Sequence, residues 1–158
     1  MNKKILLIAL CCSLAFAGNA QKSENMRYEI ECADNGTQGT YLVKVWVYTK
    51  DTNFSYEMLK KYAVHGVIFK GYTGKNGCQG QKPISQTPDL EKENSSFFHH
   101  FFNKDKAYVK YATEVDGSIE RVKIGTEYKY GAIIVVSKDV LRKDLEQAGI
   151  IRGLSDGF

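Results

Sequence analysis

The sequence is poor in the residues from which metal and catalytic sites are usually built. It has three histidines, His65, His99 and His100, and only two cysteines beyond residue 20, Cys32 and Cys78. It contains no CxxC or HExxH motif, and its glycine-rich segment lacks the GxxxxGK[ST] spacing of a phosphate-binding loop. The sequence therefore offers no motif for redox, zinc or nucleotide chemistry, and we predict no catalytic residue, metal or cofactor.

A strong charge of one sign is also missing. Lys3 and Lys4 are two of the 22 Lys and Arg residues, and no acid lies in residues 1–20, so the rest of the chain carries 20 bases against 18 acids. The bases are interleaved with acids instead of clustered, which is not the pattern of a nucleic-acid-binding surface. No apolar run after residue 20 is long enough to span a membrane. We therefore predict neither a nucleic-acid partner nor a transmembrane segment there.

The first 20 residues have the pattern of a secretory signal peptide. "MNKK" is a basic start, "ILLIALCCSLAFA" is an apolar run of 13 residues, and "GNA" places small residues before Gln21. A membrane anchor is the weaker alternative because the run is short. A lipoprotein attached through Cys11 or Cys12 is also less favoured, since neither follows a small residue. We predict a signal peptide at residues 1–20, followed by one domain at residues 21–158 that is exported to the periplasm or cell surface.

Removal of the signal peptide would leave an even number of cysteines. In an oxidising compartment, the pair Cys32 and Cys78 suggests one disulfide. The alternative is two unpaired thiols, one of them buried and the other in a loop. The sequence favours the bridge without proving it.

The hydrophobic pattern predicts an α+β fold. Period-2 alternation predicts strands, whereas apolar residues three and four apart predict helices. The last half of 128–136 is apolar on both faces, so this strand should be central. The expected order is strand 27–33, strand 40–50, helix 55–70, glycine-rich loop 71–86, a helix starting at Thr87, strands 106–115, 119–124 and 128–136, and a helix after Ser137. Within 55–70 the run "VIF" could instead begin a strand, but the helix is favoured. We predict an antiparallel sheet of about five strands with about three helices packed on it.

The segment "SSFFHHFF" could be read as a histidine site or as core. On a helix, its four phenylalanines fall on one side and His99 and His100 straddle the other. Adjacent histidines on a helix diverge, whereas helical metal sites use residues four apart. We therefore interpret this segment as a core helix whose opposite side is polar.

Two groups of residues form the candidate binding surface. Trp46 and Tyr48 lie on the less apolar side of the second predicted strand, where they either stack beneath a helix or form part of an exposed aromatic surface. Tyr72, Lys75 and Asn76 lie in the glycine-rich loop, which is long for an ordered loop unless it is functional or tied down.

Three segments resemble an uncharacterised family of exported proteins from Bacteroides-type bacteria. These are "KKYAVHGVIFKGYTG", the "FF…FF" helix and "YKYGAIIVVSKDVLRKDLEQAGII", and the "AGNAQ" end of the signal is also common there. The resemblance covers nearly all of the chain after the signal peptide and implies an envelope location with no established activity. A fainter similarity links the strand–helix ending to small α+β modules of envelope and flagellar assembly proteins, and no functional residue is carried over from it.

These observations leave three hypotheses. The first is a non-catalytic interaction or assembly module of the cell envelope, whose partner protein is unknown. The second is a periplasmic protein that binds a small ligand between the sheet and the loop. The third and least favoured is a hydrolase, since any active site would have to be assembled from residues distant in the sequence.

Overall fold

The computed structural model describes residues 27–153 of the 158-residue chain. The predicted signal peptide at residues 1–20 lies outside the described residues. Within the described part, five strands form one antiparallel sheet. They are β1 (Arg27–Asp34), β2 (Tyr41–Thr49), β3 (Ala112–Glu114), β4 (Glu120–Ile124) and β5 (Glu127–Val136).

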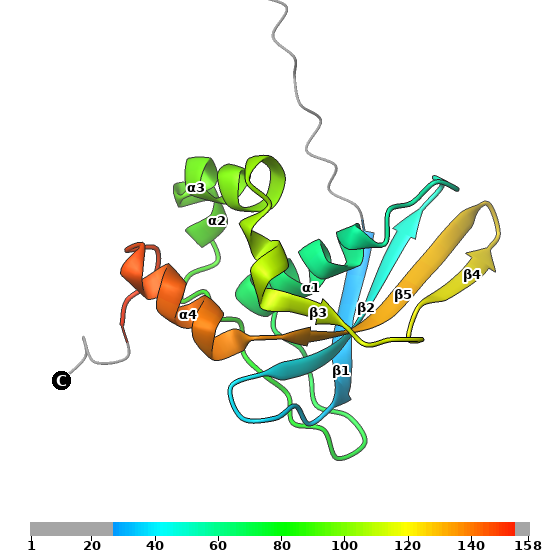
Figure 1. Ribbon diagram of the computed structural model, residues 1–158, viewed down its shortest axis with the longest axis horizontal. Coiled ribbons are helices and arrows are strands. Elements are labelled where there is room, and N and C mark those ends of the chain that lie inside the picture. The colour runs from blue at the N-terminus through cyan, green and yellow to red at the C-terminus, as the bar shows by residue number, and fades with distance from the viewer. Residues whose placement is uncertain (1–26, 154–158) are drawn as a thin grey trace, which may run out of the picture.

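β5 is the central strand of the sheet, as its two-sided apolar character predicted. β2 pairs along one side of it, and β1 pairs in turn with β2. The other side of β5 is shared, because β4 pairs with its first half and β3 with its second half. The α+β class and the antiparallel five-stranded sheet predicted from the sequence are confirmed (Figure 1).

The helices form a layer on one face of this sheet. α1 (Glu57–Phe69) contacts β1, β2, β3 and β5. It is followed, after a loop, by α2 (Leu90–Glu93), α3 (Ser95–His99) and the π-helical turn η1 (His100–Lys104). The 3₁₀ helix η2 (Ala107–Tyr111) precedes β3, and α4 (Lys138–Gln147) follows β5. Figure 1 shows these helices gathered together, with the hairpin formed by β4 and β5 projecting away from them.

The core lies between α1 and the sheet. Val43, Val45 and Val47 of β2 are completely buried, as are their counterparts on β5, and all of them point towards the helices. α1 approaches β1 closely at Gly66, where a β-carbon would come within 2.7 Å of the Ile30 side chain. Because buried aliphatic side chains of this kind each contribute about 1.5–3 kcal/mol, this one-sided packing stabilises the sheet from the helix face.

The segment with adjacent histidines is confirmed as a core helix whose opposite side is polar. Phe98, Phe101 and Phe102 are buried, whereas His99 and His100 are exposed. The helical region begins with α2 at Leu90, three residues later than the predicted start at Thr87, and is interrupted at Asn94 before α3; no side chain caps α2. It ends in a π-helical turn, which places Phe101 and Phe102 next to each other in the core with ring centroids 4.8 Å apart.

The strand predicted at residues 106–115 is wrong over most of its length. Residues 107–111 form the 3₁₀ helix η2, and only 112–114 are extended. In a 3₁₀ helix, side chains three apart lie on one face. Tyr108 and Tyr111 are therefore buried together, stacked on Phe102 and Phe101, while Val109 is 41% exposed.

Candidate interaction surface

The second face of the sheet carries no helix layer in the described chain. We call it the open face. In an antiparallel pair, residues directly opposite each other point to the same side, so the strand register identifies its members. They are Arg27, Glu29 and Glu31 of β1; Leu42, Lys44, Trp46 and Tyr48 of β2; Thr113 of β3; Glu120, Val122 and Ile124 of β4; and Glu127, Lys129, Gly131, Ile133 and Val135 of β5. Except for Gly131, these residues are exposed or half-buried.

Trp46 lies at the middle of the open face, directly over a glycine. Its strand partner is Gly131, and a β-carbon on Gly131 would overlap the Cε3 and Cζ3 atoms of the indole ring. The indole Nε1–H donates a hydrogen bond of 3.0 Å to the Glu31 carboxylate. The indole is therefore held in one position, because its ring fills the space left by the missing side chain of Gly131 and its edge is hydrogen-bonded to the Glu31 carboxylate.

Charged side chains of both signs surround this indole. The ammonium groups of Lys44 and Lys129 lie 4.5 and 4.4 Å from the indole ring centroid, close enough for cation–π attraction. Lys44 also forms an ion pair of 2.7 Å with Glu120. Partial burial by itself would lower the pKa of Lys129, but hydrogen bonds and charge from Tyr48 and Glu29 outweigh it and raise that pKa. Lys129 therefore stays charged beside the indole.

Tyr48 is fixed in the same way as Trp46. Its hydroxyl donates a hydrogen bond of 2.9 Å to Glu29, and the guanidinium of Arg27 lies 4.2 Å from its ring centroid. Arg27 also pairs with Glu127 across the sheet at 3.1 Å. The polar and cation–π contacts of these open-face side chains run between the strands themselves. The two aromatic residues of this group therefore form a preordered patch with both charge signs around it.

The three candidate residues of the glycine-rich loop do not join this patch. The ring of Tyr72 meets that of Tyr41 edge-on at 5.7 Å, and Tyr41 lies five residues before Trp46 on the helix-facing side of β2. Burial raises the pKa of Tyr72 to about 12. The predicted binding residues thus fall into two places, Trp46 and Tyr48 on the open face and the loop residues at the end of the sheet.

Lys75 and Asn76 are exposed at a tight turn in this loop. The amide of Cys78 donates a hydrogen bond of 3.1 Å to the carbonyl of Lys75, and Asn76 and Gly77 both have positive φ values, 54° and 85°. Two consecutive positive φ values are typical of a type I′ turn, for which Asn-Gly is a preferred sequence. The backbone conformation therefore explains the presence of Asn76.

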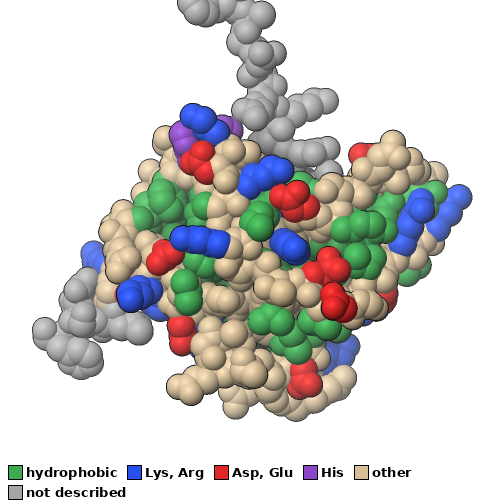
Figure 2. All heavy atoms as spheres, viewed as in Figure 1, with side chains coloured by type: hydrophobic (Ala, Val, Ile, Leu, Met, Phe, Trp, Pro, Cys, Tyr) green, Lys and Arg blue, Asp and Glu red, His purple; other side chains and the backbone are tan. Residues whose placement is uncertain are grey.

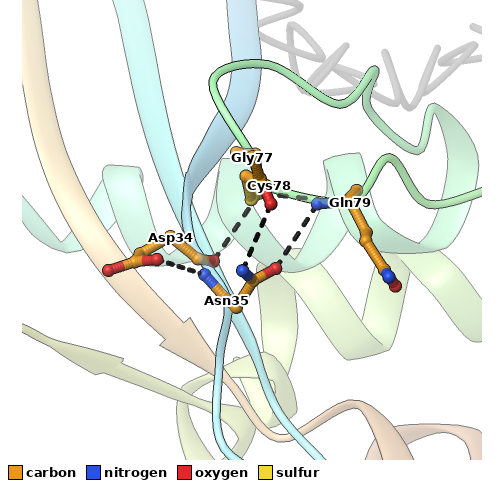
Figure 3. Close-up of a disulfide and its surroundings, with 6 residues drawn as sticks. Asp34, Asn35, Gly77, Cys78 and Gln79 are labelled. Carbon is orange, nitrogen blue, oxygen red and sulfur yellow. Dashed lines mark hydrogen bonds between the residues drawn. A yellow bond between two sulfur atoms is a disulfide. The ribbon is translucent and has the colours of Figure 1, made fainter.

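The predicted disulfide is present and ties this turn to β1. Cys32 and Cys78 are bonded, with their α-carbons 6.2 Å apart. Figure 3 shows Asn35 beside the bridge, where its side-chain amide donates to the Gly77 carbonyl and accepts from the Gln79 amide at 3.3 and 3.4 Å. The bridge and Asn35 together place the glycine-rich loop at the end of the sheet.

A polar pocket of about 590 Å³ lies beside this loop. Its walls are the turn between β1 and β2, the disulfide, the rings of Tyr41 and Tyr72, and the first residues of α4. Tyr41 donates a hydrogen bond of 2.9 Å to Gln81, and the ammonium of Lys138 lies 4.7 Å from the Tyr41 ring centroid. The pocket therefore combines two aromatic rings with side chains that can hydrogen-bond or pair with a small polar ligand.

Sequence reasoning did not identify three hydrogen-bonded side chains, Tyr28, His65 and Glu91, that link β1, α1 and α2. The hydroxyl of Tyr28 lies 2.6 Å from Nδ1 of His65, and Nε2 of His65 lies 3.2 Å from Glu91. A catalytic hydroxyl must reach substrate, but here the hydroxyl belongs to the buried Tyr28 and the carboxylate end is the exposed one. Burial raises the pKa of Tyr28 well above its usual range. This chain of contacts therefore joins β1, α1 and α2 and does not present an activated nucleophile.

Two further findings concern metal and membrane. Residues 27–153 hold no group of three or more His, Cys, Asp or Glu side chains arranged to bind a metal ion. None of the helices in that range has the length and apolar character needed to cross a bilayer.

Comparisons of the chain with models of protein families, with curated protein sequences and with solved structures found no match. The resemblance to exported Bacteroides-type proteins therefore stays a prediction.

Proposed function

We propose that this chain is an exported, non-catalytic protein of the cell envelope that binds another protein through the open face of its sheet. The observation that carries the proposal is the indole of Trp46, half-exposed and fixed over Gly131 at the middle of that face. Tryptophan and tyrosine are enriched among the residues that dominate binding energy at protein interfaces. A side chain that is already ordered loses less conformational entropy on binding. Trp46 and Tyr48 fit this role.

The charge pattern of the open face favours a protein partner. Acids and bases alternate across the strands, with Glu29 and Glu31 on β1 and Lys44 and Lys129 on the next strands. A polyanion such as nucleic acid is bound by a surface of one sign. A surface of mixed sign around aromatic residues is instead typical of protein interfaces, where charge complementarity selects the partner and fixes its orientation.

Export is supported by two independent features. The first 20 residues have the pattern of a signal peptide, and the Cys32–Cys78 disulfide is compatible with an oxidising compartment. Disulfides are rare in proteins that remain in a reducing cytosol. The proposed partner is therefore another protein of the envelope or of the cell surface.

The proposal is tested by in-cell chemical crosslinking of the tagged full chain, followed by mass spectrometry of what it captures. We expect a reproducible envelope protein with the wild-type chain and its loss with the Trp46→Ala/Tyr48→Ala double variant. The matched control is His99→Ala/His100→Ala, which removes two exposed ring side chains from the helix layer. Capture that survives the open-face variant, or that is lost equally with the control, would contradict the proposal.

A second candidate function is the binding of a small polar ligand in the pocket beside the glycine-rich loop. The specific observation is that Tyr72 meets Tyr41 there, with Gln81 and Lys138 within reach. A thermal-shift screen of small polar compounds against the protein tests it. We expect a true ligand to raise the melting temperature of the wild-type protein and to lose this effect in the Lys138→Ala variant. A screen without any such compound would remove this candidate.

A further inference from the structure

The strand β4 has one unused edge. It pairs with β5 on one side, and within residues 27–153 no strand pairs with its other side. All five of its residues are exposed, and the two apolar ones, Val122 and Ile124, are 46% and 49% exposed. An edge of this kind presents backbone N–H and C=O groups that another extended segment can use.

The turn between β4 and β5 determines which backbone groups face outwards. It is a two-residue loop between the pair Ile124 and Glu127, and Gly125 has a φ of +59°, as the first position of a type II′ turn requires. In such a hairpin the pair next to the loop exchanges hydrogen bonds, and bonded and non-bonded pairs then alternate. The N–H and C=O groups of Arg121 and Lys123 therefore point to the free edge.

The side chains of these same two residues carry positive charge. They lie opposite Tyr130 and Tyr128, on the helix-facing side of the sheet. Neither Arg121 nor Lys123 forms an ion pair with any described carboxylate, although most charged residues of the open face are paired. The guanidinium of Arg121 is held 4.2 Å from the Tyr128 ring centroid. Figure 2 shows Lys and Arg side chains gathered over the projecting hairpin, next to hydrophobic ones. The edge thus alternates two unpaired cations with two exposed apolar side chains.

We propose that the free edge of β4 binds an extended segment of a partner protein in which acidic residues alternate with apolar ones. The segment would add a strand to the sheet, placing its acids beside Arg121 and Lys123 and its apolar side chains beside Val122 and Ile124 on the open face. This inference rests on the proposed function, since it names the chemistry of the partner at the margin of the same surface.

A second copy of the chain fits this edge less well. In an antiparallel pairing of two β4 strands centred on Val122, Arg121 of each copy would lie opposite Lys123 of the other. Like charges directly opposite each other destabilise a strand pair. The two cations that favour an acidic segment therefore disfavour self-association.

The test uses two synthetic peptides, acetyl-Val-Glu-Val-Glu-Val-Glu-amide and its analogue with lysine in place of glutamate. Each is titrated into ¹⁵N-labelled protein purified after expression of the full chain. We expect the glutamate peptide to bind saturably with a dissociation constant below about 1 mM. The amide resonances of Arg121 and Lys123 should shift most, and the lysine peptide should bind at least tenfold more weakly.

Three variants separate backbone pairing from charge. Lys123→Pro removes an outward N–H, whereas Lys123→Gln removes only the charge, so the proline variant should weaken binding more. The Arg121→Glu/Lys123→Glu variant should reverse the preference and favour the lysine peptide. The matched control, Lys82→Glu/Lys92→Glu, makes the same change in net charge at exposed sites outside the sheet and should leave binding unchanged. The amide spectrum of each variant shows directly whether it remains folded.

Several results would overturn the inference. They are no saturable binding, equal binding of both peptides, or shifts that avoid β4. Concentration-dependent dimerisation through β4 would also overturn it, since the edge would then be occupied by a second copy. If the peptides fail while the Trp46→Ala/Tyr48→Ala variant still loses its crosslinked partner, the β4 inference is wrong and the proposed function stands.

Discussion

The position of Trp46 over Gly131 makes a sharp prediction about a Gly131→Ala variant. Within a strand, alanine is ordinarily more favourable than glycine by about 0.5–1 kcal/mol because the unfolded chain loses less entropy. Here the new methyl group would overlap two carbons of the indole ring and approach its Cη2 atom to 2.9 Å. Forcing a methyl group into filled space typically costs about 1–3 kcal/mol. We therefore expect the variant to be less stable than the wild-type protein.

A double-mutant cycle isolates this contact. Urea unfolding, followed by circular dichroism, is measured for the wild-type protein, Gly131→Ala, Trp46→Ala and the double variant. We expect Gly131→Ala to destabilise only when the indole is present, giving a coupling energy of about 1–3 kcal/mol. Trp46 is the only tryptophan in the chain, so its emission should also shift to longer wavelength in Gly131→Ala as the ring is displaced. Equal effects of Gly131→Ala in both backgrounds, with no emission shift, would refute the described position of the indole.

Three further predictions concern the disulfide and the contacts of His65 with Tyr28 and Glu91. Replacing both Cys32 and Cys78 by serine should cost about 4 kcal/mol in urea unfolding, because the bridge closes a loop with a sequence separation of 46, and a loss below about 1 kcal/mol would be inconsistent with this. Nitrogen NMR of the His65 ring should show the proton on Nε2, because the ionised Glu91 carboxylate facing Nε2 can only accept and Nδ1 is then left to accept from the hydroxyl of Tyr28; a proton on Nδ1 would contradict this pairing. The hydrogen bond from His65 lowers the pKa of Glu91. The stabilising contribution of this contact is therefore complete above the ordinary carboxyl pKa of about 4.3, and it is lost as the pH falls through the lowered pKa of Glu91. Glu91→Gln should therefore flatten the acid side of the stability–pH profile, and an unchanged profile would count against the contact.

The parts of the fold that were predictable are those where the local pattern and the tertiary packing agree. β5 alternates along its first half and is apolar on both faces along its second half, and it lies at the centre of the sheet. Residues 106–115 show the opposite case. Their alternation predicted a strand, but Tyr108 and Tyr111 find stacking partners in Phe102 and Phe101, and this packing favours a 3₁₀ helix. No local pattern reveals such partners.

The same distinction applies to the candidate site. Alternation along β2 placed Trp46 and Tyr48 on one face, which the register of the sheet confirms. The role of Gly131 depends on a partner 85 positions away in the chain, and only the strand register brings the two together. Tyr72 was predicted as part of the same surface, but its contact with Tyr41 places it at the end of the sheet on the helix side. Sequence alone does not specify where a long loop docks.

The proposed function requires that the open face, and not the helix layer, contacts the partner protein. The most direct measurement is in-cell photocrosslinking with a photoreactive amino acid placed at Val122 or at Val140, one position at a time. Both valines are about half exposed, at 46% and 54%, but Val122 lies on the open face and Val140 on α4. We expect one envelope protein to be captured from Val122 and not from Val140. Capture from Val140 alone, or equally from both positions, would contradict it.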